Sequence, residues 1–210
     1  MKHRKANVKI VDVVREKGYE KYLYKCISPM PFRKYRKRRE YLEKAVPRGF
    51  SKKILFFKEV AVGQIEYAPV EVSGYPILGE GIVVMHCIWV LRKAKGHGFG
   101  KRLLAVMRRE HGDAEGFATV ALENHWSPWL KKEHMEYLGF KPIASMKVTH
   151  RTKHRGEPFK IYLMWLPNKE KAEQPSWNQE QMLEGVHFCI AHPLYHPQNF
   201  EDKHILAKVE

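Results

Sequence analysis

The sequence predicts a mixed α/β fold, and three observations support it. Apolar segments of strand length alternate with segments of helical periodicity along most of the chain. One of these segments, residues 81–90, is nearly continuously apolar and leads through a glycine-rich turn into an amphipathic basic helix. The chain has 210 residues, of which 44% are hydrophobic, and this is enough for one substantial domain with an ordinary core.

The elements are expected in a definite order, set by hydrophobic periodicity and by Pro and Gly signals. In chain order these are a strand over 8–14, helices over 16–27 and 33–46, a turn at 47–49, a hairpin of 54–58 and 61–67 closed around Glu59-Val60, the strand 81–90, a helix starting near Gly98, a strand over 118–122, a helix opened by Ser127-Pro128 and closed by Gly139, and strands over 143–150 and 160–166.

Three alternating glycines, Gly96, Gly98 and Gly100, occupy the turn after the long apolar strand. Glycine has no Cβ, so a ligand can approach the bare backbone and the amide N–H groups can converge on it. The following helix adds its unpaired N-terminal donors and the positive end of its dipole, and Lys95 and Arg102 add full charges. The turn therefore predicts a binding site for a pyrophosphate.

The glycine spacing excludes two common phosphate-binding motifs. A Walker A loop requires a glycine five residues before Gly100, where this chain has Lys95, and Ser or Thr after Lys101, where it has Arg102. A dinucleotide-binding fingerprint that starts at Gly96 would require a glycine at its sixth position, which is Lys101.

The spacing instead resembles the central motif of the GNAT superfamily of acetyl-CoA-dependent N-acetyltransferases, with Lys95 where that motif has Arg or Gln. The resemblance implies a central, mixed but mostly antiparallel sheet flanked by helices. It also implies that acetyl-CoA is the cosubstrate, with its pyrophosphate on the amides of the turn and its pantetheine arm along a strand end that splays from its neighbour. The residues expected to contact it are Ile88, Trp89, Val90, Lys95, Gly96, His97, Gly98, Phe99, Gly100, Lys101 and Asn124. An ordinary glycine-rich connection is the alternative, and the order of the elements argues against it.

The implied reaction is direct attack of a primary amine on the thioester, with a backbone N–H near residues 88–90 stabilising the oxyanion. His86, four residues before Val90, is the leading general base, because imidazole titrates near neutrality and serotonin N-acetyltransferases carry a histidine at the matching position. A buried structural histidine is the alternative, and Glu80 and Glu66 are other candidate bases. Cys87 is expected on the opposite face of the strand, in the core.

The proton donor departs from the family pattern. Many members have a tyrosine four residues before the Gly-Phe that ends the last helix, and here that residue is Met135. Tyr137 is displaced by two residues, which turns its side chain by roughly 200°. Asn124 also lies farther from Gly139 than the usual asparagine does. Water can supply the proton to the departing thiolate. The alternative function for the whole protein is a non-catalytic module that binds acyl-CoA or nucleic acid.

The chain carries a formal charge of +15, which predicts attraction to polyanions and favours an anionic acceptor. The densest basic cluster runs from Arg33 to Arg39 and has six cationic residues in seven. It could bind nucleic acid, although we favour a solvated helix face, because the sequence contains no recognisable nucleic-acid-binding module.

Two regions are expected: a GNAT-like domain over residues 1–166, and a linker with a small extension over residues 167–210, similar to the YoaP-like subset. The extension contains His187, Cys189, His192 and His196, but without a paired Cys-x-x-Cys motif we predict no metal. Three widely spaced cysteines indicate reduced thiols, and no signal peptide or membrane-spanning segment is expected. We therefore expect a cytoplasmic protein, either a monomer or a homodimer.

Overall fold

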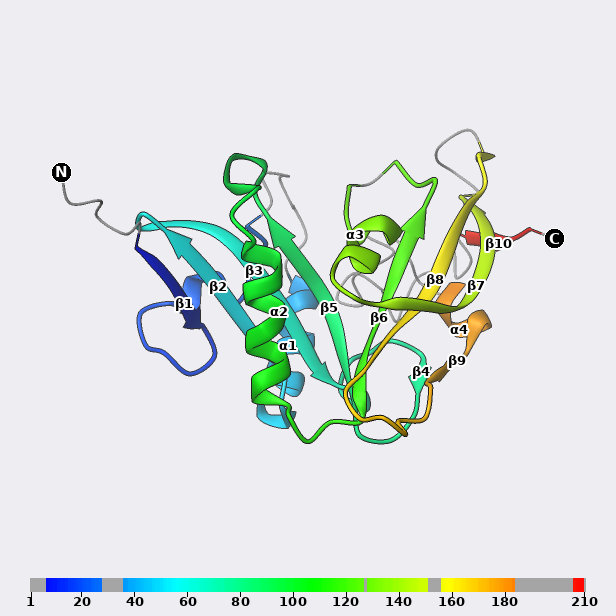
Figure 1. Cartoon of the computed structure of the whole chain (residues 1–210), viewed down its shortest axis with the longest axis horizontal. Helices are drawn as coiled ribbons and strands as arrows, with labels where there is room; N and C mark the ends of the chain where they lie inside the picture. Colours follow the sequence, from blue (N-terminus) through cyan, green and yellow to red (C-terminus); the bar gives the residue numbers. More distant parts are fainter. Residues whose placement is uncertain (1–6, 28–35, 127, 151–155, 184–205, 210) are drawn as a thin grey trace.

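The structure is a computed structural model that describes residues 7–27, 36–126, 128–150, 156–183 and 206–209. An eight-stranded sheet has the order β1-β2-β3-β5-β6-β8-β7-β10, and β4 and β9 form a second, two-stranded sheet (Figure 1). The strands of the large sheet are β1 (Val8–Asp12), β2 (Ser51–Phe57), β3 (Val60–Pro69), β5 (Ile82–Val90), β6 (Gly116–Glu123), β8 (Phe159–Pro167), β7 (Lys141–His150) and β10 (Leu206–Lys208). The pair β5–β6 is parallel, whereas the other neighbouring pairs of this sheet are antiparallel.

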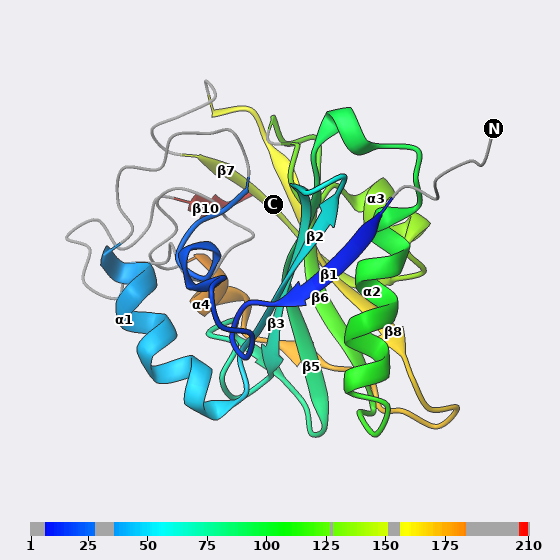
Figure 2. The same ribbon diagram turned by 90° about the vertical axis from the view of Figure 1, so that its left-hand side faces the viewer.

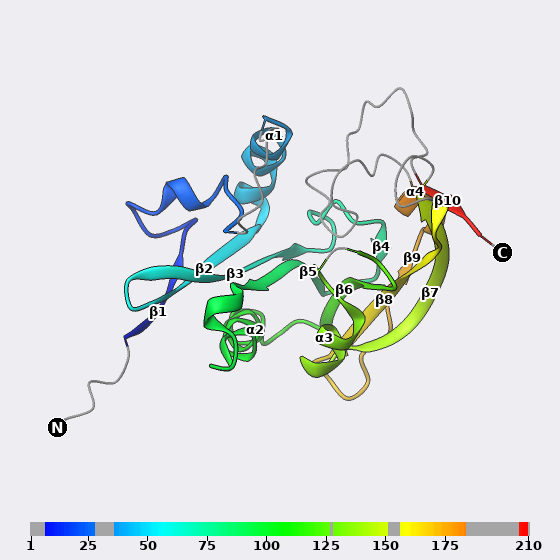
Figure 3. The same cartoon turned by 90° about the horizontal axis from the view of Figure 1, so that it is seen from above.

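Helices cover both faces of the large sheet. Helix α2 (Phe99–Glu110) and helix α3 (Lys132–Tyr137) lie on one face, and α1 (Arg36–Ala45) lies on the other, as Figures 2 and 3 show. Helix α2 buries Leu103, Leu104 and Met107 against the sheet, at the helical spacing expected of an amphipathic helix. The predicted mixed, mostly antiparallel sheet with flanking helices is therefore confirmed.

The hairpin of β2 and β3 forms where it was predicted, but its turn lies one residue earlier. Lys58 and Glu59 both have positive φ, 50° and 63°, as a two-residue type I′ turn requires. Val60 already pairs with Phe57 and belongs to β3. The predicted turn at Glu59-Val60 is corrected to Lys58-Glu59.

The predicted helix over residues 16–27 is wrong, because this segment contains only a 3₁₀ turn, Glu20–Tyr22. Tyr19 and Tyr22 pack edge-on against Phe56 of β2, with ring centroids 5.7 and 5.6 Å away. Farther along, the amide of Ile27 donates to the side-chain oxygen of Gln64 on β3. Aromatic packing and hydrogen bonds to the sheet thus replace the helical hydrogen bonds that the periodicity suggested.

The part of the extension that the structure describes pairs with the rest of the protein. Strand β9 (Ser176–Trp177) pairs with β4 (Ile77–Leu78), just before β5, and helix α4 (Gln179–Leu183) follows. Strand β10 pairs antiparallel with β7 and buries Leu206. The extension therefore supplies one edge strand of the main sheet.

No helix in the described ranges is both long enough and apolar enough to cross a membrane. The same ranges contain no group of three or more metal-ligating side chains. The cluster of His187, Cys189, His192 and His196 lies outside the described residues.

Candidate active site

Strands β5 and β6 pair over only three residues before they separate. Their parallel register joins Ile82, Val83 and Val84 to residues 116–118, and just beyond it the Thr119 hydroxyl donates to the carbonyl of Met85 at 2.7 Å. From there the two strands diverge, as Figure 1 shows. The edge of β5 that faces β6 is therefore not paired with β6 over residues 86–90, so this edge can accept a ligand.

A β-bulge interrupts β5 at His86. Glu66 of β3 pairs with Cys87 and Tyr67 pairs with Met85, so His86 is the extra residue between two consecutive partners. A bulge redirects side chains and often occurs beside active sites. It places His86 at the point where β5 leaves β6.

The bulge also corrects the prediction for Cys87. The Cys87 sulfur lies 3.6 Å from the side-chain nitrogen of Gln64, and Gln64 also contacts Cys26 and Ile27 on the face that α1 covers. His86 contacts Tyr41 of α1 and so lies on the same face. The predicted alternation of the two side chains fails because the bulge inserts one residue. Cys87 is nevertheless buried, as expected of a core cysteine.

The glycine loop follows β5 after a short 3₁₀ helix, Arg92–Ala94, and has the conformation that a phosphate cradle needs. Gly96 and Gly98 have φ values of 85° and 68°, and a Cβ built on either of them would meet no atom within 4 Å. The first hydrogen bond of α2 runs from the amide of Arg102 to the carbonyl of Gly98 at 3.1 Å. In the part of the chain that the structure describes, the amides of residues 96–101 donate no backbone hydrogen bond. Bare backbone and free N–H groups therefore face open space at the start of a helix.

Some side chains of the loop pack against the protein, and others are exposed and charged. Phe99 is buried and packs against Phe57, with ring centroids 5.3 Å apart, and His97 stacks on Phe99 at 5.2 Å. Lys95 and Lys101 are exposed, and the Lys101 ammonium lies 4.4 Å from the ring centroid of Tyr137. His97 and Phe99 thus hold the loop on β2, while the lysines leave positive charge at its surface.

Aromatic rings enclose His86. Its imidazole is fully buried and stacks on Phe50, with centroids 5.7 Å apart and an interplanar angle of 17°. The rings of Tyr75 and Tyr41 lie at 5.7 and 6.3 Å. This enclosure was not predicted from the sequence, because the three rings come from the segment before β2, the segment before β4 and helix α1.

The two alternative bases lie in different environments. Glu66 is fully buried on the strand beside the bulge, and its carboxylate lies 2.8 Å from the ammonium of Lys52, which is equally buried. Lys52 also donates to the carbonyl of Lys25 at 2.6 Å. Glu80 is exposed in the turn before β5, at the end of the strand away from the glycine loop. The structure therefore brings Glu66 close to His86 and leaves Glu80 apart.

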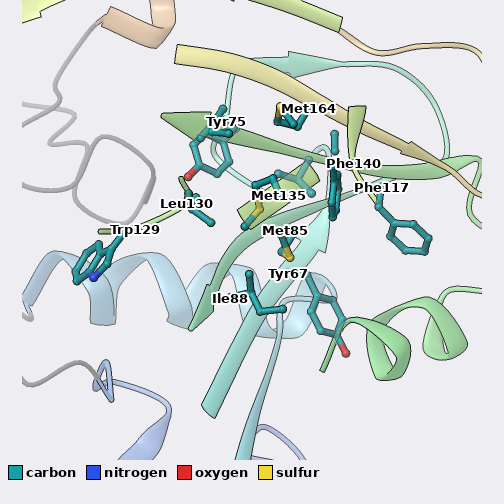
Figure 4. Packing of buried hydrophobic residues seen from close by; sticks show 14 of the residues in the cluster. Tyr67, Tyr75, Met85, Ile88, Phe117, Trp129, Leu130, Met135, Phe140 and Met164 are labelled. Carbon is teal, nitrogen blue, oxygen red and sulfur yellow. The ribbon is translucent and has the colours of Figure 1, made fainter. Parts of the chain in front are cut away.

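The two residues considered for the proton donor lie as their spacing predicted. Met135 is 2% exposed and points into the core (Figure 4), whereas Tyr137 is 67% exposed. Asn124 is exposed at the end of β6 in a left-handed conformation, with φ 59°. Beside it, a hydrogen bond from Tyr162 and the ammonium of Lys132 lower the pKa of Glu123.

The unusual spacing between Asn124 and Gly139 reflects a segment that turns back onto β6. Leu130 accepts a hydrogen bond from the amide of Leu122 at 2.8 Å, and Lys131 bridges to Leu122 in parallel register. Helix α3 therefore begins only at Lys132, and the predicted start at Ser127-Pro128 is wrong. Ser127 itself lies outside the described residues.

Of the basic cluster from Arg33 to Arg39, the structure describes one side chain. The guanidinium of Arg39 lies 5.2 Å from the ring centroid of Tyr24. The other side chains of the cluster lie outside the described residues.

Comparison with solved structures identifies the fold. An acetyltransferase of the GNAT family from Desulfovibrio desulfuricans matches with a TM-score of 0.55 and 14% identity, over 78% of this chain and 100% of that one. The ribosomal-protein-S18-alanine N-acetyltransferase of Escherichia coli matches with a TM-score of 0.53 and 11% identity, over 80% and 97%. An N-acetyltransferase from Staphylococcus aureus matches with a TM-score of 0.52 and 11% identity, over 78% and 99%.

No protein-family model matches the sequence, and no curated protein does. The protein therefore has the GNAT fold, as the glycine motif and the order of the elements predicted. The matches cover almost the whole of these neighbours but only about four-fifths of this chain.

Proposed function

We propose that this protein is an acetyl-CoA-dependent N-acetyltransferase that acts on a primary amine by direct attack. One observation carries the proposal: the glycine loop, with its free amides, follows the strand whose edge is released from β6, with a short 3₁₀ helix, Arg92–Ala94, between them. A pyrophosphate on the loop and an extended arm along β5 would then form one continuous binding path that ends near the bulge.

The residues that we assign to the cosubstrate fit this path. Gly96 and Gly98 leave space that a Cβ would fill, and the amides of residues 96–101 supply donors. Lys95 and Lys101 add positive charge, and the backbone of residues 88–90 offers a strand edge. We place Asn124, just after the end of β6, beside the same path, while His97 and Phe99 position the loop.

For the chemistry, we propose His86 as the general base, because it occupies the bulge at the point where β5 leaves β6. Glu66, next to it on β3, is the alternative base. Its ion pair with Lys52 instead favours a structural role, in which the carboxylate neutralises the buried ammonium of Lys52. A backbone N–H of residues 88–90 would stabilise the oxyanion as the amine attacks the carbonyl carbon. The carbon–sulfur bond then breaks, and water protonates the departing thiolate.

Substitutions of Gly98 test the proposal. Asn and Asp have the same shape and both tolerate a left-handed backbone, so their difference isolates a negative charge at the cradle. We expect Gly98→Asp to bind acetyl-CoA at least about tenfold more weakly than Gly98→Asn, as like charges about 4 Å apart cost roughly 1–4 kcal/mol. Titration calorimetry measures both affinities.

Gly18 provides the matched control, because it is exposed, has a φ of 88°, and a Cβ there would also meet no atom within 4 Å. Gly18→Asp should bind acetyl-CoA like the parent protein. Equal affinities for Gly98→Asp and Gly98→Asn, or no acetyl-CoA binding to the parent, would refute the proposed site.

A non-catalytic acyl-CoA-binding protein is the second candidate. The observation that favours it is the buried Met135 at the position where many GNAT enzymes have a tyrosine. An assay of acetyl transfer to a panel of amines separates the two functions, since the binding protein would retain affinity for acetyl-CoA without turnover.

A further inference from the structure

We infer that the indole N–H of Trp89 donates a hydrogen bond to an amide carbonyl of the pantetheine arm, and that Trp89 and Trp129 form a side-chain clasp on this arm. The inference rests on the proposed function, because it takes an acyl-CoA as the ligand. It adds the part of the ligand that these two side chains recognise.

Trp89 lies on the part of β5 that is not paired with β6. Trp89 pairs with Gln64 of β3 on one side, and its other edge belongs to the part of β5 that has left β6. It lies three residues beyond the bulge at His86 and seven before Gly96. At about 3.3 Å per residue, an extended strand covers roughly 10 Å between the bulge and Trp89.

In the described part of the chain, the indole N–H of Trp89 is an unsatisfied hydrogen-bond donor. The Nε1 atom of Trp89 is buried, and it has no hydrogen-bond partner in the part of the chain that the structure describes. A buried donor without an acceptor is destabilising, so such groups are rare and call for an explanation. Nearby polar groups do have partners: the Thr119 hydroxyl donates to the carbonyl of Met85, and the Gln64 amide contacts two sulfur atoms.

The side chain of Trp89 contacts that of Trp129. The two indole rings meet edge to face, with centroids 6.0 Å apart and an interplanar angle of 69°. Trp129 belongs to the segment that is pinned to β6 through the hydrogen bond between Leu122 and Leu130. The contact therefore connects the two strands across their divergence.

The backbone next to Trp129 is held in a costly conformation. Leu130 has a φ of 44°, a left-handed conformation that is unfavourable for a non-glycine residue. Such strain persists where surrounding contacts impose it, and it concentrates at ligand-binding sites. Here the hydrogen bond to β6 and the burial of Leu130 fix the conformation that presents Trp129 to Trp89.

The part of the ligand that would lie beside Trp89 carries groups that suit an indole ring. A molecule with its pyrophosphate on the glycine loop and its thioester near the bulge must pass Trp89 with the arm that joins them. That arm is uncharged and carries two amide groups, whose carbonyl oxygens are suitable acceptors for an indole N–H. Its methyl-bearing carbons suit contact with the aromatic rings.

Trp89→Phe tests the inference, because it keeps an aromatic ring beside Trp129 and removes only the donor. We measure binding of CoA and of 3′-phosphoadenosine 5′-diphosphate, which lacks the arm, by titration calorimetry. One hydrogen bond contributes about 0.5–1.5 kcal/mol, so CoA should bind about three- to tenfold more weakly to the variant. The affinity for the nucleotide fragment should stay within twofold, which also shows that the variant is folded.

Two further variants sharpen the test. Trp129→Ala should also weaken CoA binding and spare the fragment, because it removes the other side of the clasp. Trp126→Phe is the matched control, since Trp126 is 54% exposed, and it should change neither affinity.

The outcomes separate this inference from the proposed function. If Trp89→Phe binds CoA as the parent does, or loses CoA and fragment affinity equally, the clasp is refuted while the acyl-CoA site stands. A raised KM for the amine with unchanged CoA affinity would assign the donor to the acceptor instead. If the parent binds neither CoA nor the fragment, the proposed function fails, and the clasp fails with it.

Discussion

The environment of His86 limits how it can act. The imidazole is fully buried among Phe50, Tyr75 and Tyr41, next to the point where β5 leaves β6. Water is largely kept from such a site, which strengthens the electrostatic interactions within it. The enclosure therefore suits a base that works on a bound acceptor.

His86→Gln should lower kcat by about 10²–10⁴-fold, the usual contribution of a general base, with the affinity for acetyl-CoA nearly unchanged. Steady-state kinetics and calorimetry measure the two quantities. Tyr41→Phe is the control for packing, since it alters the same aromatic cluster and removes only a hydroxyl that lies within hydrogen-bond distance of the carbonyls of Val72 and Ser73. If His86→Gln retains kcat within twofold, the histidine is structural, and Glu66→Gln becomes the next variant to test.

Two adjacent buried lysines show why part of this site could not be predicted from the sequence. Lys52 pairs with Glu66, and Lys53 pairs with both Asp12 and Glu110. Both lysines are at most 1% exposed. Periodicity treats a lysine as a surface residue, because a buried charge is costly unless it is paired. Their partners lie 14, 41 and 57 residues away along the chain, so only the fold reveals the pairing.

At the scale of elements, the sequence predicted those whose signals are local. The apolar strand β5, the glycine loop and helix α2 depend on neighbouring residues, and all three form where the pattern placed them. The segment 16–27 and the start of α3 were predicted wrongly, because contacts with distant strands override helical spacing there. The bulge in β5 also left no trace in the sequence, since it is defined by the register with β3.

At the scale of the whole molecule, the extension after residue 166 packs against the domain that we predicted to end at that residue. Its strands β9 and β10 pair with β4 and β7, and Met182 and Leu206 are buried in the main core. A chain that ends after Pro167 would expose the edge of β7 and apolar surface that these residues cover.

Truncation after Pro167 should therefore lower the free energy of unfolding by several kcal/mol, since loss of each large buried apolar side chain costs about 2–5 kcal/mol. Urea unfolding of the full and truncated chains measures the difference. Leu206→Ala in the full chain should give an intermediate loss. Equal stability of the two chains would show that residues 1–166 form an independent domain, as the sequence suggested.

The central claim is that one ligand lies along the released edge of β5 and ends on the glycine loop. Amide hydrogen exchange with and without acetyl-CoA tests it most directly, because the amides of residues 96–101 donate no backbone hydrogen bond in the described structure. We predict that acetyl-CoA slows exchange in residues 86–90 and 96–101, with little change in β1 or β7. Unchanged exchange in both segments at saturating acetyl-CoA, or protection confined to helix α1, would contradict the account.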